Sequence, residues 1–208
     1  IYLVMYSPNN DLNEQLKIWM KVLLAMITLI ILVGGLTRLT DSGLSITTWE
    51  LIVGVLPPLT NEKWIEYFNL YKDIPEYKEQ NFNMSLNDFK IIFWWEWAHR
   101  QLGRLIGLLT FIPMIYFTIK HGFWILKKYG IIFLLVCLQG LIGWYMVSSG
   151  LVDRVDVSHY RLSIHLLMAF IILSLIYWNY LKLKNLNISR EINNYLTFFF
   201  VFLIFFQI

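Results

Sequence analysis

Four long apolar stretches separated by polar or basic segments dominate the pattern of this chain. A helix rises about 1.5 Å per residue, so a stretch of about 20 apolar residues can cross a hydrocarbon core about 30 Å thick. A fifth apolar stretch, residues 195–208, closes the sequence. The pattern predicts an all-α polytopic membrane protein: a four-helix transmembrane bundle plus a partial fifth helix. The four predicted spans are residues 18–37, 91–119, 130–148 and 159–181.

The segment between the first two spans, residues 39–90, is long and mostly polar. Within it, residues 61–71 place aromatic side chains at helical spacing, which predicts a short amphipathic helix on the membrane surface. Ser85 and Asp88 have the spacing of a helix N-cap. Pro113 inside the second span predicts a kink there.

The short connections predict the orientation. Residues 120–129 hold three lysines and no acid, and residues 182–194 hold three basic residues against one acid. Short basic loops stay on the cytoplasmic side, so we expect both connections and the N-terminus on the cytoplasmic or matrix side. The segment 39–90 and the turn 149–158 then form the outer side.

We divide the chain according to these spans. Since the sequence starts at Ile1 and ends within an apolar stretch, we expect a piece of a longer polypeptide, without a cleavable signal peptide. The expected parts are an N-terminal cytoplasmic or matrix segment, a four-helix transmembrane half that contains the outer loop, and a final loop with a truncated fifth span. Their boundaries are 1–17, 18–181 and 182–208.

The composition agrees with a membrane protein. The 208 residues are 58% hydrophobic, 17% aromatic and only 15% charged, with a mean hydropathy of +0.57, whereas about a quarter of the residues of a soluble domain are charged. The net charge of +3 is small and no basic cluster alternates with exposed aromatics, so no nucleic acid partner is expected. The single cysteine, Cys137, lies in an apolar stretch, which excludes a disulfide within this sequence.

Two histidines lie inside predicted spans, His99 in the second and His165 in the fourth. Ionisable groups inside a membrane are costly and usually functional. Counted from starts near Ile91 and Val157, each histidine lies eight residues, or about 12 Å, into its span, and the two spans run in the same direction. Bundle cores bind cofactors between facing helices, and paired imidazoles are axial ligands of heme iron. We therefore predict a heme iron between His99 and His165.

Charged residues accompany both histidines. Glu96 lies three residues before His99 on the same helix face, so its carboxylate can orient the imidazole or act on a bound group. It is equally placed to pair with Arg100, four residues later. Arg38, Arg100 and Arg161 fall near the outer boundary, where guanidinium groups can bind heme propionates. Arg161 also fits a simple boundary anchor.

A faint internal repeat accompanies this pattern, because the first and third spans both leave the membrane through Ser-Gly-Leu, at 42–44 and 149–151. Several longer motifs, in this order, resemble heme A synthase of the proteobacterial and mitochondrial type, and the resemblance covers about residues 18–170. The motifs are GGLTRLTDSGLS at 34–45, the proline pair at 57–58, FWWEWAHR at 93–100 with Gly103 and Arg104, QGLIGWYMVSSGL at 139–151 and VSHYRLSIHL at 157–166.

The resemblance implies an eight-helix fold made of two similar four-helix halves, of which this chain is the first. It implies oxidation of the C8 methyl group of heme O to a formyl group, with water as the oxygen source, to make heme A for cytochrome c oxidase. His99 and His165 match the family's ligands of the substrate heme, and Glu96 matches its essential carboxylate. A heme b cofactor belongs to the second half, so we expect this piece alone not to complete turnover.

The resemblance also implies partners and a location. Expected partners are heme O and heme A, membrane lipid, heme O synthase, assembly factors of cytochrome c oxidase and a second copy of the chain. The expected location is the bacterial plasma membrane or the mitochondrial inner membrane. In one departure from some family members, residues 39–90 contain no cysteine pair. Two alternatives remain open: a bis-histidine b-type cytochrome that transfers electrons without modifying heme, and a heme-free transporter or scaffold.

Overall fold

The computed structural model describes residues 8–50 and 53–184, and every regular element within them is a helix. Four helices there are long and apolar enough to cross a membrane. This confirms the predicted polytopic all-α class. The fifth apolar stretch and most of residues 182–194 lie outside the described residues. The four long helices are α1 (Pro8–Leu39), α4 (Leu86–His121), α5 (Trp124–Asp153) and α6 (His159–Leu183).

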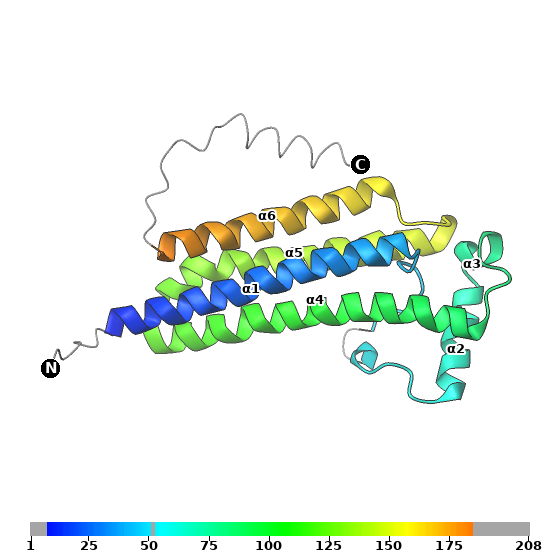
Figure 1. The fold of residues 1–208 in the computed structure, drawn as a ribbon, viewed down its shortest axis with the longest axis horizontal. Coiled ribbons are helices and arrows are strands. Elements are labelled where there is room, and N and C mark those ends of the chain that lie inside the picture. Colours follow the sequence, from blue (N-terminus) through cyan, green and yellow to red (C-terminus); the bar gives the residue numbers. More distant parts are fainter. Residues whose placement is uncertain (1–7, 51–52, 185–208) are drawn as a thin grey trace.

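The long helices form a four-membered ring. α4 packs against α1 and α5, and α6 packs against the same two helices. α4 and α6 therefore lie diagonally opposite each other, as do α1 and α5. Figure 1 shows the four helices running side by side, with the smaller helices at one end of the bundle.

The helices extend beyond the predicted apolar stretches. α1 begins at Pro8, ten residues before the expected start of the first span. The basic connection predicted at residues 120–129 is wrong in extent, since only Gly122 and Phe123 separate α4 from α5. The reason is physical: hydropathy marks where lipid ends, whereas lysine is a good helix former and lets the helix continue into the polar region. Gly122 makes the turn with a positive φ of 101°, which favours glycine.

Pro113 lies within α4, and the helix runs through it without interruption. Proline has no N–H, so the carbonyl of Leu109, four residues earlier, lacks its helical partner. The indole N–H of Trp19 on α1 donates to that carbonyl oxygen at 2.8 Å. The contact satisfies a polar group that lipid could not satisfy.

The chain between α1 and α4 (residues 40–50 and 53–85), called the outer segment below, folds over the N-terminal end of α4. It contains a short 3₁₀ turn, η1 (Val53–Val55), and two helices, α2 (Asn61–Lys72) and α3 (Pro75–Glu79). The predicted amphipathic helix is confirmed as α2, but its apolar face is buried against protein: the ring centroids of Trp64 and Phe93 are 5.0 Å apart. The aromatic side chains at the start of α4 are therefore the partners of this face, and the position of α2 on the membrane surface stays a prediction.

The start of α4 has the local structure that its sequence predicts. The Asp88 N–H donates to Ser85 Oγ, and the Ser85 N–H donates to Asp88 Oδ2 at 3.2 Å, which completes a capping box. These reciprocal bonds satisfy two of the free donors at the helix start and fix where α4 begins.

Buried apolar residues form two separate clusters. The inner cluster, near the end where α4 turns into α5, draws its buried members from residues 16–27, 106–117, 125–132 and 172–183. The outer cluster joins the outer segment, α2 and α3 to the first turns of α4 and to residue 157 before α6. Between them is a middle layer of the bundle that contributes to neither cluster: residues 32–43, 98–105, 137–145 and 163–167.

Candidate functional site

The end of α1 turns the chain back toward α4. Asp41 has a left-handed φ of 47°, the Ser42 N–H donates to the Thr37 carbonyl, and the Asp41 N–H donates to the Arg38 carbonyl. This bonding pattern is a Schellman motif with aspartate in the position that glycine usually takes. It directs the next residues, including Ser45, over the first turns of α4, where Ser45 Oγ contacts the Ile92 carbonyl and Glu96.

Glu96 of α4 is the buried anchor for that returning segment. It is 3% exposed, and its Oε2 accepts hydrogen bonds from Ser45 Oγ and from the Ile46 N–H, both at 2.7 Å. Its Oε1 accepts from Arg100 Nε at 3.0 Å and Nη2 at 2.6 Å. Glu96 thus makes the ion pair with Arg100 that its sequence spacing allowed, and among the described residues no hydrogen bond joins it to His99.

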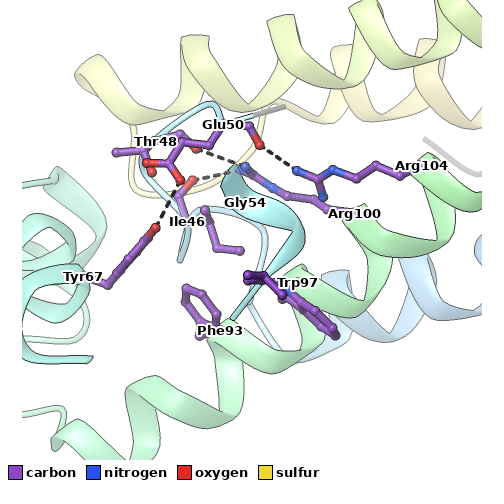
Figure 2. Close-up of a pocket in the computed structure, with 10 residues that line it drawn as sticks. Ile46, Thr48, Glu50, Gly54, Tyr67, Phe93, Trp97, Arg100 and Arg104 are labelled. Carbon is purple, nitrogen blue, oxygen red and sulfur yellow. Dashed lines mark hydrogen bonds between the residues drawn. The ribbon is translucent and has the colours of Figure 1, made fainter. Parts of the chain in front are cut away.

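The Arg100 guanidinium also binds the outer segment. Nη2 donates to the Ile46 carbonyl at 2.8 Å and Nη1 donates to the Thr48 carbonyl at 3.2 Å. One turn further along α4, Arg104 donates to the Glu50 carbonyl at 2.8 Å. Figure 2 shows both arginines pointing from α4 into this segment, around a cavity of about 10 Å³. Most Arg100 donors are therefore already used within the chain.

The other two predicted arginines keep more of their donors accessible. Arg38 pairs with Asp41 at 3.1 Å, and its side chain is 37% exposed. Arg161 donates to Ser149 Oγ, and its guanidinium lies over the ring of Tyr145, 4.9 Å from the centroid. Both lie near the outer ends of their helices, and neither has the number of backbone contacts that Arg100 has.

The two histidines project from diagonally opposite helices, His99 from α4 and His165 from α6. Both belong to the middle layer, between the inner and the outer cluster. In each ring Nδ1 is buried without a hydrogen-bond partner, whereas Nε2 is not among the buried unpaired atoms. The structure thus brings together the two imidazoles that the sequence singled out.

The helix lengths explain how the two rings meet. His99 is thirteen residues after the start of α4, and His165 is only six residues after the start of α6. The extra turns of α4 carry Phe89 and Phe93 of the outer cluster. The expected equal distance of eight residues therefore does not hold for the helix starts.

Glycines of the neighbouring helices lie against both rings, which sequence reasoning missed. A Cβ added to Gly34 of α1 would be 2.8 Å from His99 Cε1, and one added to Gly143 of α5 would be 3.0 Å from His165 Cε1. Sequence reasoning also missed Ser45 and the Ile46 N–H as partners of Glu96. Each of these residues falls in or next to a motif, but no spacing rule connects it to a partner at least 22 residues away.

A second buried carboxylate, Glu76 of α3, lies in the outer segment. It accepts a hydrogen bond from the Tyr71 hydroxyl at 2.8 Å and one from Asn81 Nδ2 at 3.4 Å. Burial raises the pKa of Glu76 to about 7, although the Tyr71 hydrogen bond opposes the rise. Glu76 is therefore a group that changes its charge near neutral pH outside the membrane spans.

The chain is similar in sequence to known proteins of one family. The COX15-CtaA family model, described as a cytochrome oxidase assembly protein, matches residues 17–208. A heme A synthase of Pelagibacter ubique is 51% identical over 207 residues, which are 98% of this chain and 62% of the relative. Heme A synthases of Maricaulis maris and Bradyrhizobium diazoefficiens are 50% and 49% identical over 83% and 86% of this chain, and over 51% and 50% of their own lengths. The chain thus spans about half to three fifths of these relatives. No solved structure matches it.

Proposed function

The chain belongs to the COX15-CtaA family of cytochrome oxidase assembly proteins, and from this membership we propose that it forms the substrate-binding half of a heme A synthase. The substrate is heme O, and the product is heme A, in which the C8 methyl group has become a formyl group. The relatives that carry the name heme A synthase are about half identical to this chain. That similarity supports the same reaction here.

One observation carries the location of the substrate. His99 and His165 extend from diagonal helices into the one layer of the described bundle that contributes to neither apolar cluster. No member of either apolar cluster lies at the level of the two imidazoles, so a tetrapyrrole bound there would displace neither cluster. Within the described part of the chain, neither Nε2 makes a hydrogen bond, which leaves its lone pair available to iron. The residues present therefore fit a heme with two axial imidazoles.

The arginines divide into two roles in this proposal. Arg38 and Arg161 bind the propionates of the substrate heme, because each retains accessible guanidinium donors near the outer end of its helix. Arg100 remains a third candidate, but its contacts with Glu96, Ile46 and Thr48 make it mainly a tie between α4 and the outer segment.

Glu96 is the proposed catalytic carboxylate. Two successive two-electron oxidations would convert the methyl to an alcohol and then to a hydrated aldehyde, which loses water. Each step would add the oxygen of one water molecule and release two protons, and its two electrons would pass to the heme b proposed for the second half of the longer protein. A carboxylate beside the reacting carbon stabilises positive charge there and takes up the released proton. Glu96 already accepts four hydrogen bonds. It can take up a proton only when Ser45, Ile46 or Arg100 gives up one of them, which would couple the outer segment to the reaction.

The same proposal includes the division of the chain into parts, a second heme and the protein partners. The three parts of the chain keep the boundaries 1–17, 18–181 and 182–208, and the electron-accepting heme b belongs to the second half of the longer protein. Heme O synthase, assembly factors of cytochrome c oxidase and a second copy of the chain are the proposed protein partners.

The orientation is proposed from charge. Lysines gather at the end of the bundle away from α2 and α3, where Lys128 lies over Trp124 and Lys182 over Trp178. This end would face the cytoplasm or matrix. The heme site and the outer segment would then face the opposite side of the bacterial plasma membrane or mitochondrial inner membrane.

The hydrogen bonding of Glu96 also favours a second candidate function, that of a b-type cytochrome. A carboxylate that anchors a loop needs no catalytic role, and a b-type cytochrome would use the same two histidines. Analysis of heme types separates the candidates: the full-length protein is expressed in a strain without its own heme A synthase, and hemes are extracted and identified. Heme A in the extract supports the synthase, and heme O alone supports the cytochrome.

The same assay tests the site. We expect His99→Ala and His165→Ala to abolish heme A, while His159→Ala, at an exposed position on the same helix as His165, keeps it. Wild-type levels of heme A in both ligand variants would show that the substrate binds elsewhere.

A further inference from the structure

Each of the two histidine rings lies against a glycine of a neighbouring helix. A Cβ on Gly34 would be 2.8 Å from His99 Cε1, which is closer than real Cβ atoms come to other heavy atoms. A Cβ on Gly143 would be 3.0 Å from His165 Cε1, at the same limit. No larger residue fits at Gly34 unless the imidazole moves, and at Gly143 the imidazole must give way by at least a few tenths of an ångström.

Neither ring is held by a hydrogen bond within the described residues. Nδ1 of His99 and Nδ1 of His165 are both buried and unpaired. In most metal-binding histidines the nitrogen that points away from the metal donates to a carbonyl or carboxylate, and this bond fixes the ring orientation. Something else must fix it here, and the glycine backbone is the surface that each ring contacts.

We propose that Gly34 and Gly143 are positioning residues that orient the His99 and His165 rings toward the substrate heme. This inference rests on the proposed function of the two histidines. The glycine backbone lies against the Cε1 edge of each ring, between its two nitrogens, and so limits how the ring can turn. A methyl group at either glycine would turn the ring off its preferred rotamer and move Nε2 out of line with the iron.

The arrangement occurs twice. Gly34 on α1 supports the histidine of α4, and Gly143 on α5 supports the histidine of α6. The second contact is reinforced by Gln139, whose side-chain amide donates to the His165 carbonyl at 3.0 Å and holds α5 against α6 at this level. Because the two contacts come from different helix pairs, each ring provides a separate test.

The chain offers matched controls for both positions. Gly35 is adjacent to Gly34, and Gly140 lies about one turn before Gly143. A Cβ at either control position meets no atom within 4 Å. Glycine-to-alanine changes at these four sites therefore alter the helix backbone in the same way, and only two of them press on an imidazole.

The test is a titration of the chain, purified in detergent, with ferric iron protoporphyrin IX. The readouts are the Soret band and the low-spin electron paramagnetic resonance signal of a bis-histidine heme. We expect Gly34→Ala and Gly143→Ala to bind the heme about 3- to 10-fold more weakly, the equivalent of one off-rotamer torsion. Part of their low-spin signal should become high-spin. Gly35→Ala and Gly140→Ala should match the wild type.

The outcomes separate the proposed heme site from the proposed positioning role of the two glycines. If the wild-type chain binds no heme, the proposed function of the histidines fails. If the wild type binds heme and all four variants share its affinity and spectrum, the positioning role fails. If only one of Gly34→Ala and Gly143→Ala is recovered folded, that variant decides. Failure of both to fold would assign the glycines to helix packing and would also overturn the proposal.

Discussion

The indole N–H of Trp19 donates to the carbonyl oxygen of Leu109 across 2.8 Å, which joins α1 to α4. Leu109 is four residues before Pro113, so this carbonyl has no helical N–H partner. Trp19 itself is 6% exposed, and its ring packs against Phe117 and Tyr129. The pair therefore supplies from another helix the bond that proline removes.

We expect Trp19→Phe to destabilise the bundle by about 1–3 kcal/mol, because it leaves the Leu109 carbonyl unpaired in an apolar region. In a Pro113→Ala background the same change should cost less, since residue 113 then has an N–H for that carbonyl. Thermal unfolding in detergent of the four proteins of this double-mutant cycle measures the coupling.

The control for that cycle is Trp124→Phe. Trp124 is 45% exposed, and water can replace its bond to the His121 carbonyl. We expect almost no change in stability for this variant. If Trp19→Phe lowers the stability equally with and without Pro113, the Trp19 indole does not replace the hydrogen bond that Leu109 loses to the proline.

A second prediction concerns the buried pair of Glu96 and Arg100. Glu96→Ala leaves the Arg100 guanidinium buried beside an empty partner position, and we expect a loss of about 3–5 kcal/mol of stability. Glu96→Ala combined with Arg100→Leu should recover part of that loss, since neither charge then remains unpaired. Unfolding curves of the single and double variants provide the comparison, and additive losses would show that the pair is not coupled.

Glu96→Gln separates stability from chemistry. The amide oxygen still accepts from Ser45 and the Ile46 N–H, so we expect the outer segment to stay in place and heme to stay bound. The carboxylate is lost, and the full-length variant should stop at heme O or the alcohol. Heme A at the wild-type rate, identified by heme extraction, would remove Glu96 from the reaction.

A third prediction concerns pH. Burial raises the pKa of Glu76 in the folded protein to about 7, from its ordinary value of 4.5. The folded state then binds the proton more tightly than the unfolded state, so this group lowers stability as pH rises from about 4.5 to about 7. At 1.36 kcal/mol per pKa unit the loss is about 3 kcal/mol, complete above pH 7.

Glu76→Gln should flatten that pH dependence, because the amide has no proton to lose. Melting temperatures between pH 5 and pH 8 test this expectation. Glu79→Gln, at an exposed position on the same helix, is the matched control and should behave like the wild type. The same slope in Glu76→Gln and in the wild type would assign the pH dependence to other groups.

A fourth prediction concerns the contact between the two Ser-Gly-Leu motifs. A Cβ on Gly150 would be 2.9 Å from Leu44 Cδ2, in the outer cluster. We expect Gly150→Ala to cost about 1–3 kcal/mol through overpacking. Gly140→Ala meets no atom within 4 Å and should instead stabilise α5 by up to about 1 kcal/mol, since alanine favours helices. Thermal unfolding of the two variants should therefore shift in opposite directions, and the same shift in both would refute the close contact.

Local features of the sequence determined much of the fold. Apolar stretches longer than a bilayer is thick can hardly form anything but spans, because lipid leaves no other partner for the backbone. The Ser85 capping box and the amphipathic α2 were equally predictable, since their signals lie within a few residues. His99 and His165 could be selected because charge-bearing groups are rare in apolar helices.

The contacts that make the site were decided only by tertiary structure. Glu96 accepts bonds from Ser45 and Ile46, about fifty residues away, and Gly34 contacts a histidine sixty-five residues away. Helical spacing can pair Glu96 with Arg100 or with His99, but it cannot weigh these partners against a distant hydroxyl or amide. The sequence by itself determined which residues enter the bilayer, because hydrophobicity is a property of each residue. The contacts between these residues were decided only when the helices packed into a ring, because a contact depends on the positions of two segments that lie far apart in the sequence.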